Sequence, residues 1–334
     1  MNGKKVSRTD NIYISRILGP VSSDTDKSTS TVLSVGIDSA NTIRREVLKG
    51  IIPDPSLRVS LGKTDNEISK RMPRGEIDHF ETETGFVVHG AIVRYTFTQR
   101  NARVHLLSNG HGRGRSAVIR VIGANPVISV LVKLADGRSA VLAAMQGYIG
   151  YAKFNRDGLA NVSYVPSSNN YRHWAYKRKE DEINRLRALV AVSVEHNTFN
   201  IRSEHDAEML ARKIRVEKSI DPTLGLYAAH GYNQAGQDKH VADVLRYMER
   251  DIQAVLYDLM VLSSRIKPKP VTNQKIVPFC PMLTQTWNLL RPRGIKIPEV
   301  LNEASFYLCN SLWTTFQPKA TDKIIQAIKA GELK

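Results

Sequence analysis

The stretch whose residue types could carry chemistry is the run 108–116, SNGHGRGRS, which follows an apolar segment of strand length. A histidine in a glycine-rich loop can act as the general base of a nucleophilic site, because an imidazole can accept the proton of a thiol. That chemistry requires a cysteine close to His111. The next cysteine along the chain, Cys280, lies in an apolar helical context. One hypothesis for the chain is therefore a hydrolase centred on His111.

The same loop has two other interpretations. Arg113 and Arg115, together with the backbone amides of a glycine-rich loop, could contact phosphate groups. The simplest interpretation is a glycine-rich hairpin tip with no chemical role.

The charge distribution supports the phosphate interpretation over a wider area. The chain carries a net charge of +16, and no acidic residue occurs between Glu83 and Asp136 or between Asp258 and Glu299. Basic surfaces around residues 94–133 and 265–296 could therefore bind nucleic acid, or the cations could simply keep the protein in solution. The candidate contact residues for an anion or nucleic acid are Arg103, His111, Arg113, Arg115, Arg120, Lys267, Lys269 and Lys275.

Other classes of chemistry find little support in the sequence. The histidines do not pair with each other, with cysteine or with acids at a known ligand spacing, so we assign no metal. We find no phosphate-binding loop, dinucleotide fingerprint or nucleophile elbow, and we assign no cofactor. Whether the chain is an enzyme stays open, and the pattern favours a protein without catalytic activity.

The composition is that of an ordinary globular protein, with 42% hydrophobic and 24% charged residues over a length of 334 residues. This length allows two domains with cores of their own. No apolar run approaches the roughly 20 residues that span a bilayer, and the first residues do not have the pattern of a secretory signal. We therefore expect a cytoplasmic protein that does not enter a membrane.

The pattern predicts an α+β chain in three parts. Residues 1–41 are rich in Ser, Thr and Asp and are expected to form a flexible segment. In residues 42–175, apolar or alternating runs of strand length are separated by turn signals such as ADGR, and these predict an antiparallel β-sandwich or barrel. Residues 176–334 have helical periodicity and are expected to form an α-helical domain.

The best-defined element of the helical part is a pair of helices within residues 221–263. Asp221 is the expected N-cap, with Pro222 as the first helical residue, and Gly236 is the expected stop. A second, longer apolar stripe then runs from Val241 to Leu259.

Aromatic residues in and after this pair are candidates for a partner surface, although aromatic residues at helical spacing usually belong to a core. The candidates are Tyr227, Tyr232, Tyr247, Trp287 and Trp313. The tyrosines of residues 147–176 and Trp174 also suit an edge or interface, because their rings carry a polar tip.

The first helix pair resembles one tetratricopeptide unit, through Leu224-Gly225, Tyr227, Ala228 and Ala235-Gly236. We find no second copy at the period of about 34 residues that an array requires.

A resemblance that covers more of the chain is carried by GYIGYAKF, LANVSYVPSSNNYR, DPTLGLYAAHGYNQAG, PMLTQTW and LWTTF. Together these stretches are similar to uncharacterised bacterial regions that accompany caspase-like or trypsin-like peptidases. The resemblance implies a protein partner, such as a protease of either kind, for which this chain would be the accessory or the substrate. The leading hypothesis is therefore a non-catalytic adaptor or regulator in a bacterial stress or defence pathway.

Overall fold

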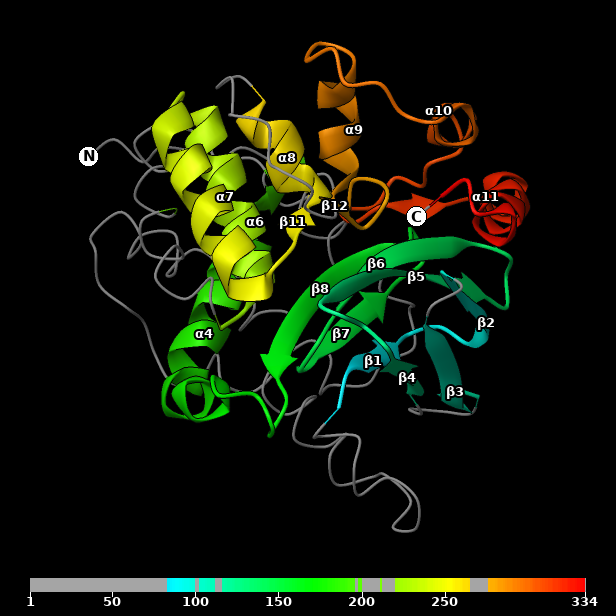
Figure 1. The fold of residues 1–334 in the computed structure, drawn as a ribbon, viewed down its shortest axis with the longest axis horizontal. Helices are drawn as coiled ribbons and strands as arrows, with labels where there is room; N and C mark the ends of the chain where they lie inside the picture. The colour runs from blue at the N-terminus through cyan, green and yellow to red at the C-terminus, as the bar shows by residue number, and fades with distance from the viewer. Residues whose placement is uncertain are drawn as a thin grey trace, which may run out of the picture.

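The computed structural model describes residues 83–99, 102–111, 116–195, 198–199, 211, 220–264 and 276–333. Within them, strands fill the first part of the chain and helices most of the second, as the sequence predicts (Figure 1). The predicted flexible segment 1–41 lies outside the described residues. Among those residues, none of the helices combines the length and the apolarity needed to cross a membrane.

Five strands form the larger sheet. Their spatial order is β3 (Arg103–Asn109), β4 (Ala117–Ile122), β1 (Gly85–His89), β7 (Tyr148–Phe154) and β8 (Leu159–Pro166). Neighbouring strands are antiparallel except β1 and β7, which are parallel in the register Gly85 to Ile149. The prediction of a purely antiparallel sheet is therefore wrong at this pair, because the chain visits the other sheet between β4 and β7.

Four strands form the smaller sheet, in the order β13 (Thr315–Phe316), β6 (Ser139–Met145), β5 (Val127–Leu134) and β2 (Val93–Thr98). All its pairs are antiparallel. The β5–β6 turn contains Gly137 at a φ of +88°, as a tight hairpin requires. Neither sheet closes on itself, so the predicted barrel is excluded for the strands that the structure describes.

One short segment near the C-terminus covers an edge of both sheets. Thr315 and Phe316 pair with Ala140 and Ser139 of β6, while Trp313 forms a bridge to Leu159 of β8. The Leu159 amide also donates a hydrogen bond of 2.8 Å to Oγ1 of Thr315. Residues 313–316 thus satisfy backbone groups that an open sheet edge would expose.

The helices follow the strands and are linked by two small two-stranded ladders. The helices are α4 (His173–Ser193), α6 (Pro222–Gln234), α7 (Asp238–Ile252), α8 (Tyr257–Ser263), α9 (Thr284–Leu290), α10 (Glu299–Ser305) and α11 (Pro318–Ala330). The ladders pair β9 (Val194–Glu195) with β10 (Thr198–Phe199), and β11 (Val255–Leu256) with β12 (Ile276–Val277).

The predicted helix pair is present as α6 and α7, but its second helix is shorter than the apolar stripe. Gln253 adopts a left-handed conformation at a φ of 54° and ends α7, and the chain then extends into β11 before α8 begins. The stripe continues past this break because Val255 and Leu256 remain buried as a strand. Apolar spacing alone therefore does not reveal the interruption.

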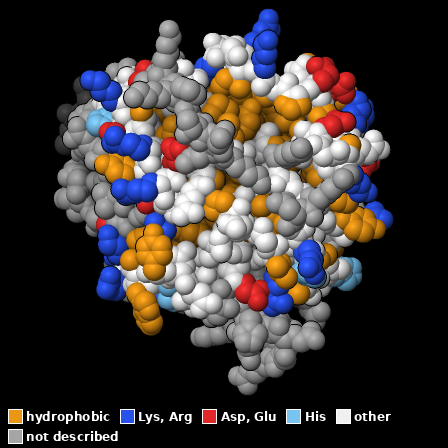
Figure 2. Space-filling model, in the orientation of Figure 1, with side chains coloured by type: hydrophobic (Ala, Val, Ile, Leu, Met, Phe, Trp, Pro, Cys, Tyr) orange, Lys and Arg blue, Asp and Glu red, His pale blue; other side chains and the backbone are white. Residues whose placement is uncertain are grey.

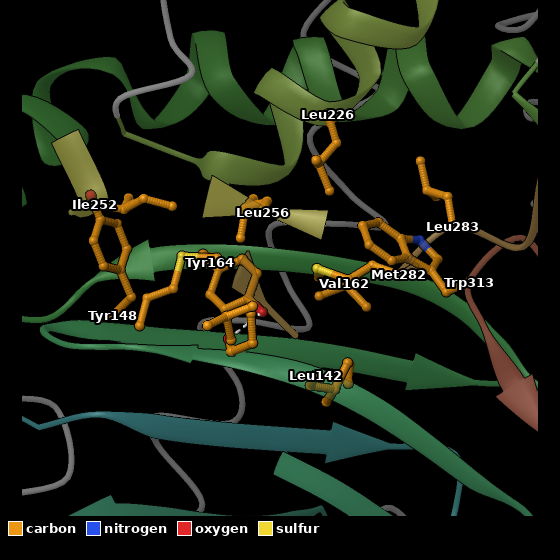
Figure 3. Packing of buried hydrophobic residues seen from close by; sticks show 14 of the residues in the cluster. Leu142, Tyr148, Val162, Tyr164, Leu226, Ile252, Leu256, Met282, Leu283 and Trp313 are labelled. Carbon is orange, nitrogen blue, oxygen red and sulfur yellow. Dashed lines mark hydrogen bonds between the residues drawn. The ribbon is translucent and has the colours of Figure 1, made fainter. Parts of the chain in front are cut away.

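The core is shared by the strands and the helices. A single cluster of buried side chains contains residues from both sheets together with α6, α7 and α8. Figure 3 shows side chains of this cluster: Tyr148, Val162 and Tyr164 project from β7 and β8 toward Leu226 of α6 and Ile252 of α7. The predicted domain border at 175/176 lies inside α4, and the core continues across it.

A second buried cluster covers the other face of the smaller sheet. Leu131 of β5 and Val141 of β6 belong to this cluster, together with residues of α8, α9, α10 and α11. Their neighbours Val130 and Leu142 belong to the first cluster. The alternation follows from the period of two along a strand, so both faces of β5 and β6 are buried.

A buried carboxylate joins β8, α4 and α6. Oδ1 of Asp221 accepts hydrogen bonds from the amide of Thr223, as the N-cap of α6, and from the amide of Tyr164 in β8. Its Oδ2 pairs with Nε of Arg187 in α4 at 2.8 Å, and Nη2 of Arg187 donates to the carbonyl of Tyr164 at 3.0 Å. β8 borders the larger sheet, so Asp221 and Arg187 satisfy both backbone groups of Tyr164 at that edge.

This arrangement gives the first prediction. We expect Asp221→Ala to lower the free energy of unfolding by about 3–5 kcal/mol, because it leaves the buried Arg187 without its counter-ion. Urea denaturation followed by circular dichroism measures the change. Asp243→Ala is the control, since Asp243 pairs with the exposed Arg246 on α7, and its cost should stay within about 1 kcal/mol. Equal effects of the two changes would contradict the role assigned to Asp221.

Candidate functional site

Large aromatic side chains lie on the surface where α4 begins and where α7 ends. Tyr171 is 78% exposed and Trp174 is 72% exposed, while Tyr247 on α7 is 36% exposed. Figure 2 shows hydrophobic groups interspersed with Lys and Arg groups along the edge of the molecule where α4 and α7 lie in Figure 1. We call this region the aromatic–arginine surface and define it by Tyr171, Trp174, Arg178, Arg246, Tyr247 and Arg250.

A chain of contacts connects the two halves of this surface. The guanidinium of Arg172 lies 4.3 Å from the centre of the Tyr171 ring and forms an ion pair of 3.3 Å with Asp251 at the end of α7. Asp251 also lies 3.6 Å from Nε of Arg250, whose guanidinium is 5.3 Å from the Tyr247 ring. The aromatic rings of α4 and α7 are therefore held in a fixed relation by a buried arginine and its carboxylate.

The surface carries interleaved charges of both signs. Asp251 serves two arginines, Arg172 and Arg250. Arg178 is exposed one helical turn after Trp174 and forms no ion pair with the residues that the structure describes. Arg178 and Arg250 therefore have capacity to meet a carboxylate from outside. Since Tyr, Trp and Arg dominate the binding energy of protein interfaces, this arrangement suits contact with another macromolecule.

The aromatic residues predicted as a partner surface are mostly in the core, and that prediction is wrong for four of the five. Tyr227, Tyr232, Trp287 and Trp313 are all buried. Tyr227 packs edge-on against Trp313, and Nε1 of Trp287 donates to Oγ1 of Thr314. The polar atom of the Trp287 ring thus finds its partner inside the protein, so a polar tip on an aromatic ring does not by itself indicate exposure. Of the five, Tyr247 alone lies on the surface. Among the aromatic residues of 147–176 that were expected at an edge or interface, Tyr171 and Trp174 are exposed, whereas Tyr148, Tyr164 and Tyr176 are buried.

Ion pairs offset part of the positive charge in the basic stretch 94–133. Nζ of Lys133 forms an ion pair of 2.6 Å with Asp322 of α11, and Arg120 pairs with Glu83. Arg103 is exposed on β3. The other predicted contacts, Arg113, Arg115, Lys267, Lys269 and Lys275, lie outside the described residues.

The predicted hydrolase centre is not assembled among the described residues. His111 is exposed, and its backbone amide donates to Oδ1 of Asn109. Cys280 lies in the cluster under α8, α9 and α11, while His111 follows β3 at the border of the larger sheet. Burial raises the pKa of the Cys280 thiol, and the nearby Asp258 acts in the same direction, so the thiolate is disfavoured.

Another histidine does contact a hydroxyl group. Nδ1 of His89 lies 2.8 Å from Oγ of Ser116, and burial, assisted by Lys153, lowers the pKa of His89. This pair joins the end of β1 to the start of β4. The sequence did not single it out, because strands β2 and β3, which belong to different sheets, lie between the two residues in the chain.

A polar network that is buried except at Gln285 joins α6, α8 and α9. Asp258 accepts hydrogen bonds from the amides of Met282 and Leu283 and from the hydroxyl of Thr286 at 2.6 Å. Because the hydroxyl hydrogen of Thr286 is donated to Asp258, Oγ1 of Thr286 can only accept from His230. Nε2 of His230 therefore donates to this oxygen over 3.2 Å. Nδ1 of His230 then accepts from the side-chain amide of Gln285 at 2.9 Å.

The order of donors in this network is not that of a nucleophilic site. There, the histidine would accept the hydroxyl proton, whereas here the carboxylate does. Burial raises the pKa of Asp258, and the hydrogen bonds that it accepts oppose that shift. The carboxylate fixes the start of α9 against α8, so the network serves to position helices.

No group of three or more His, Cys, Asp and Glu side chains that could hold a metal ion is found in the described part of the chain. Comparison of the chain with protein-family models, with curated proteins and with solved structures gives no match. The proposal of a function therefore rests on the geometry of the aromatic–arginine surface.

The buried His230 gives the second prediction. Burial, assisted by Arg293, lowers its pKa from the ordinary 6.5 to about 3. The folded state therefore keeps His230 neutral, and its contribution to stability is complete above pH 6.5 and is lost as the pH falls from 6.5 toward 3. We expect wild type to lose about 2 kcal/mol more than His230→Gln between pH 7 and pH 5, because only the wild type has this titration.

Urea denaturation at several pH values measures this difference. Because Asp258 and the other carboxyl groups are present in both proteins, their titration largely cancels in the comparison. Parallel pH profiles for wild type and His230→Gln would show that the site is open to protons, and would contradict the assignment.

Proposed function

We propose that the chain is a non-catalytic adaptor or regulatory protein that acts through protein–protein contacts. The observation that carries this proposal is the aromatic–arginine surface. Tyr171 and Trp174 are largely exposed, although both are residues that proteins usually bury at least in part. Exposed aromatic rings beside arginines are typical of the residues that dominate binding energy when a partner covers them.

The construction behind the surface supports the same proposal. α4 is joined to β8 and α6 through Arg187 and Asp221, and the turn before it is joined to α7 through Arg172 and Asp251. Because these ion pairs already hold the surface in place, it loses little conformational entropy when a partner binds. The buried Asp221 and Asp258 hold backbone amides, which is a structural use of a carboxylate.

The finer parts of the proposal rest on the sequence. We propose that the two sheets form a β-sandwich and that α6 and α7 form a tetratricopeptide-like hairpin. We also propose that the partner is a caspase-like or trypsin-like protease in a bacterial stress or defence pathway. The support for this partner is the resemblance of stretches such as DPTLGLYAAHGYNQAG to regions that accompany such peptidases.

A photocrosslinking experiment tests the proposal and is the third prediction. A photoreactive amino acid replaces Trp174 in the full chain, and the protein is irradiated in the organism that encodes it. We expect a covalent adduct with a protein partner, identified by mass spectrometry, because position 174 would lie inside the interface.

The matched control places the same photoreactive residue at position 306. Phe306 is 80% exposed and follows α10, far across the view from α4 in Figure 1. The adduct should be absent there. If neither position yields an adduct and the protein sediments as a monomer in its native extract, the adaptor function is wrong.

A further inference from the structure

We propose that the aromatic–arginine surface binds an acidic segment of its protein partner, in which an apolar side chain is flanked by carboxylates. This inference rests on the proposed function and names the chemistry of the partner. The apolar side chain would pack on Trp174 and Tyr171, and the carboxylates would pair with Arg178 and Arg250.

The apolar component follows from how the rings are supported. The Trp174 ring lies edge-on against His173, with 5.6 Å between the ring centres. Tyr171 is stacked on Arg172, whose guanidinium also donates to the Tyr148 hydroxyl at 3.4 Å and to the Asp251 carbonyl. These contacts hold the two rings in place, so their exposed apolar faces can pack against a ligand side chain without rearrangement.

The charged component follows from the pairing within the surface. Glu180 pairs with Lys177, and Asp243 pairs with Arg246. Asp251 is divided between Arg172 and Arg250. One carboxylate shared by two arginines leaves positive charge at Arg250, and Arg178 on α4 provides a second exposed arginine. A ligand with carboxylates on either side of an apolar residue complements this pattern.

The same pattern disfavours nucleic acid as the ligand of this surface. A nucleic acid strand brings a phosphate at every step, and these would approach Glu180, Asp243 and Asp251 as well as the arginines. Asp181 and Glu182 follow on the same helix as Glu180 and are exposed. A peptide, in contrast, can carry its carboxylates only at the positions that face Arg178 and Arg250.

The experiment uses a random library of 12-residue peptides displayed on phage and selected on the purified full chain. We expect the enriched peptides to contain Asp or Glu on both sides of an aromatic or aliphatic residue. A synthetic copy of an enriched peptide should bind Trp174→Ala and Arg178→Glu at least 10-fold more weakly in fluorescence anisotropy. Binding to Phe306→Ala, which alters an exposed ring elsewhere, should be unchanged.

A charge exchange shows that the effect is specific and that the variants are folded. Replacing by Lys only the acidic residue of the peptide that faces Arg178 should weaken binding to the wild type and restore binding to Arg178→Glu. This restoration is expected for direct pairing and not for a general loss of structure.

The inference is overturned if the selection returns no acidic consensus, or if the enriched peptides bind Trp174→Ala as well as the wild type. It is also overturned if a 20-nucleotide oligothymidylate binds and the same variants abolish that binding, or if sedimentation shows a dimer that Trp174→Ala dissociates. The adaptor function fails separately, in the crosslinking experiment. A partner that still crosslinks to a chain carrying Arg178→Glu would preserve the function and reject this docking chemistry.

Discussion

The structure depends most on the carboxylate of Asp221, which is fully buried between a strand and two helices. A buried charge is tolerated only when hydrogen bonds and a counter-ion replace its hydration. Here the amides of Tyr164 and Thr223 and the guanidinium of Arg187 do so. Because each donor comes from a different element, β8, α6 and α4 must come together for the charge to be satisfied. The ion pair thus fixes one arrangement of helices on the sheet.

The surface that we assign to partner binding follows from that arrangement. The chain leaves β8 at Pro166 and enters α4 at His173, and Arg187 fixes the second half of this helix, so its first turn is brought beside the end of α7. There the Arg172–Asp251 pair completes the junction and leaves Tyr171 and Trp174 in solvent. The exposed rings are thus a consequence of how the helices attach to the strands. These two ion pairs join the surface to the buried core, so we expect little rearrangement of the helices when a partner binds.

The sequence predicted local structure well and exposure poorly. Asp221 and Pro222 identify the start of α6 because capping depends on adjacent residues, and the alternating runs identify strands for the same reason. Tyr232 and Trp313 could not be assigned to the core, because burial depends on which distant elements cover a ring. Likewise, an acid-free window around Lys133 gives no sign of Asp322, which lies 189 positions away in sequence. The parallel pair β1 and β7 also depends on chain crossings that no short pattern encodes.

The segment 313–316 has a consequence for how this protein is made. Ribosomes release the chain from its N-terminus, so β6 and β8 emerge long before the residues that close their edges. Until then, each sheet presents a row of free amides and carbonyls to any other chain nearby. The strands at 139–166 and the residues near 315 must therefore meet late, over a long loop, which slows folding. A fragment that ends before Trp313 would leave these edges of β6 and β8 uncovered and able to pair with another chain.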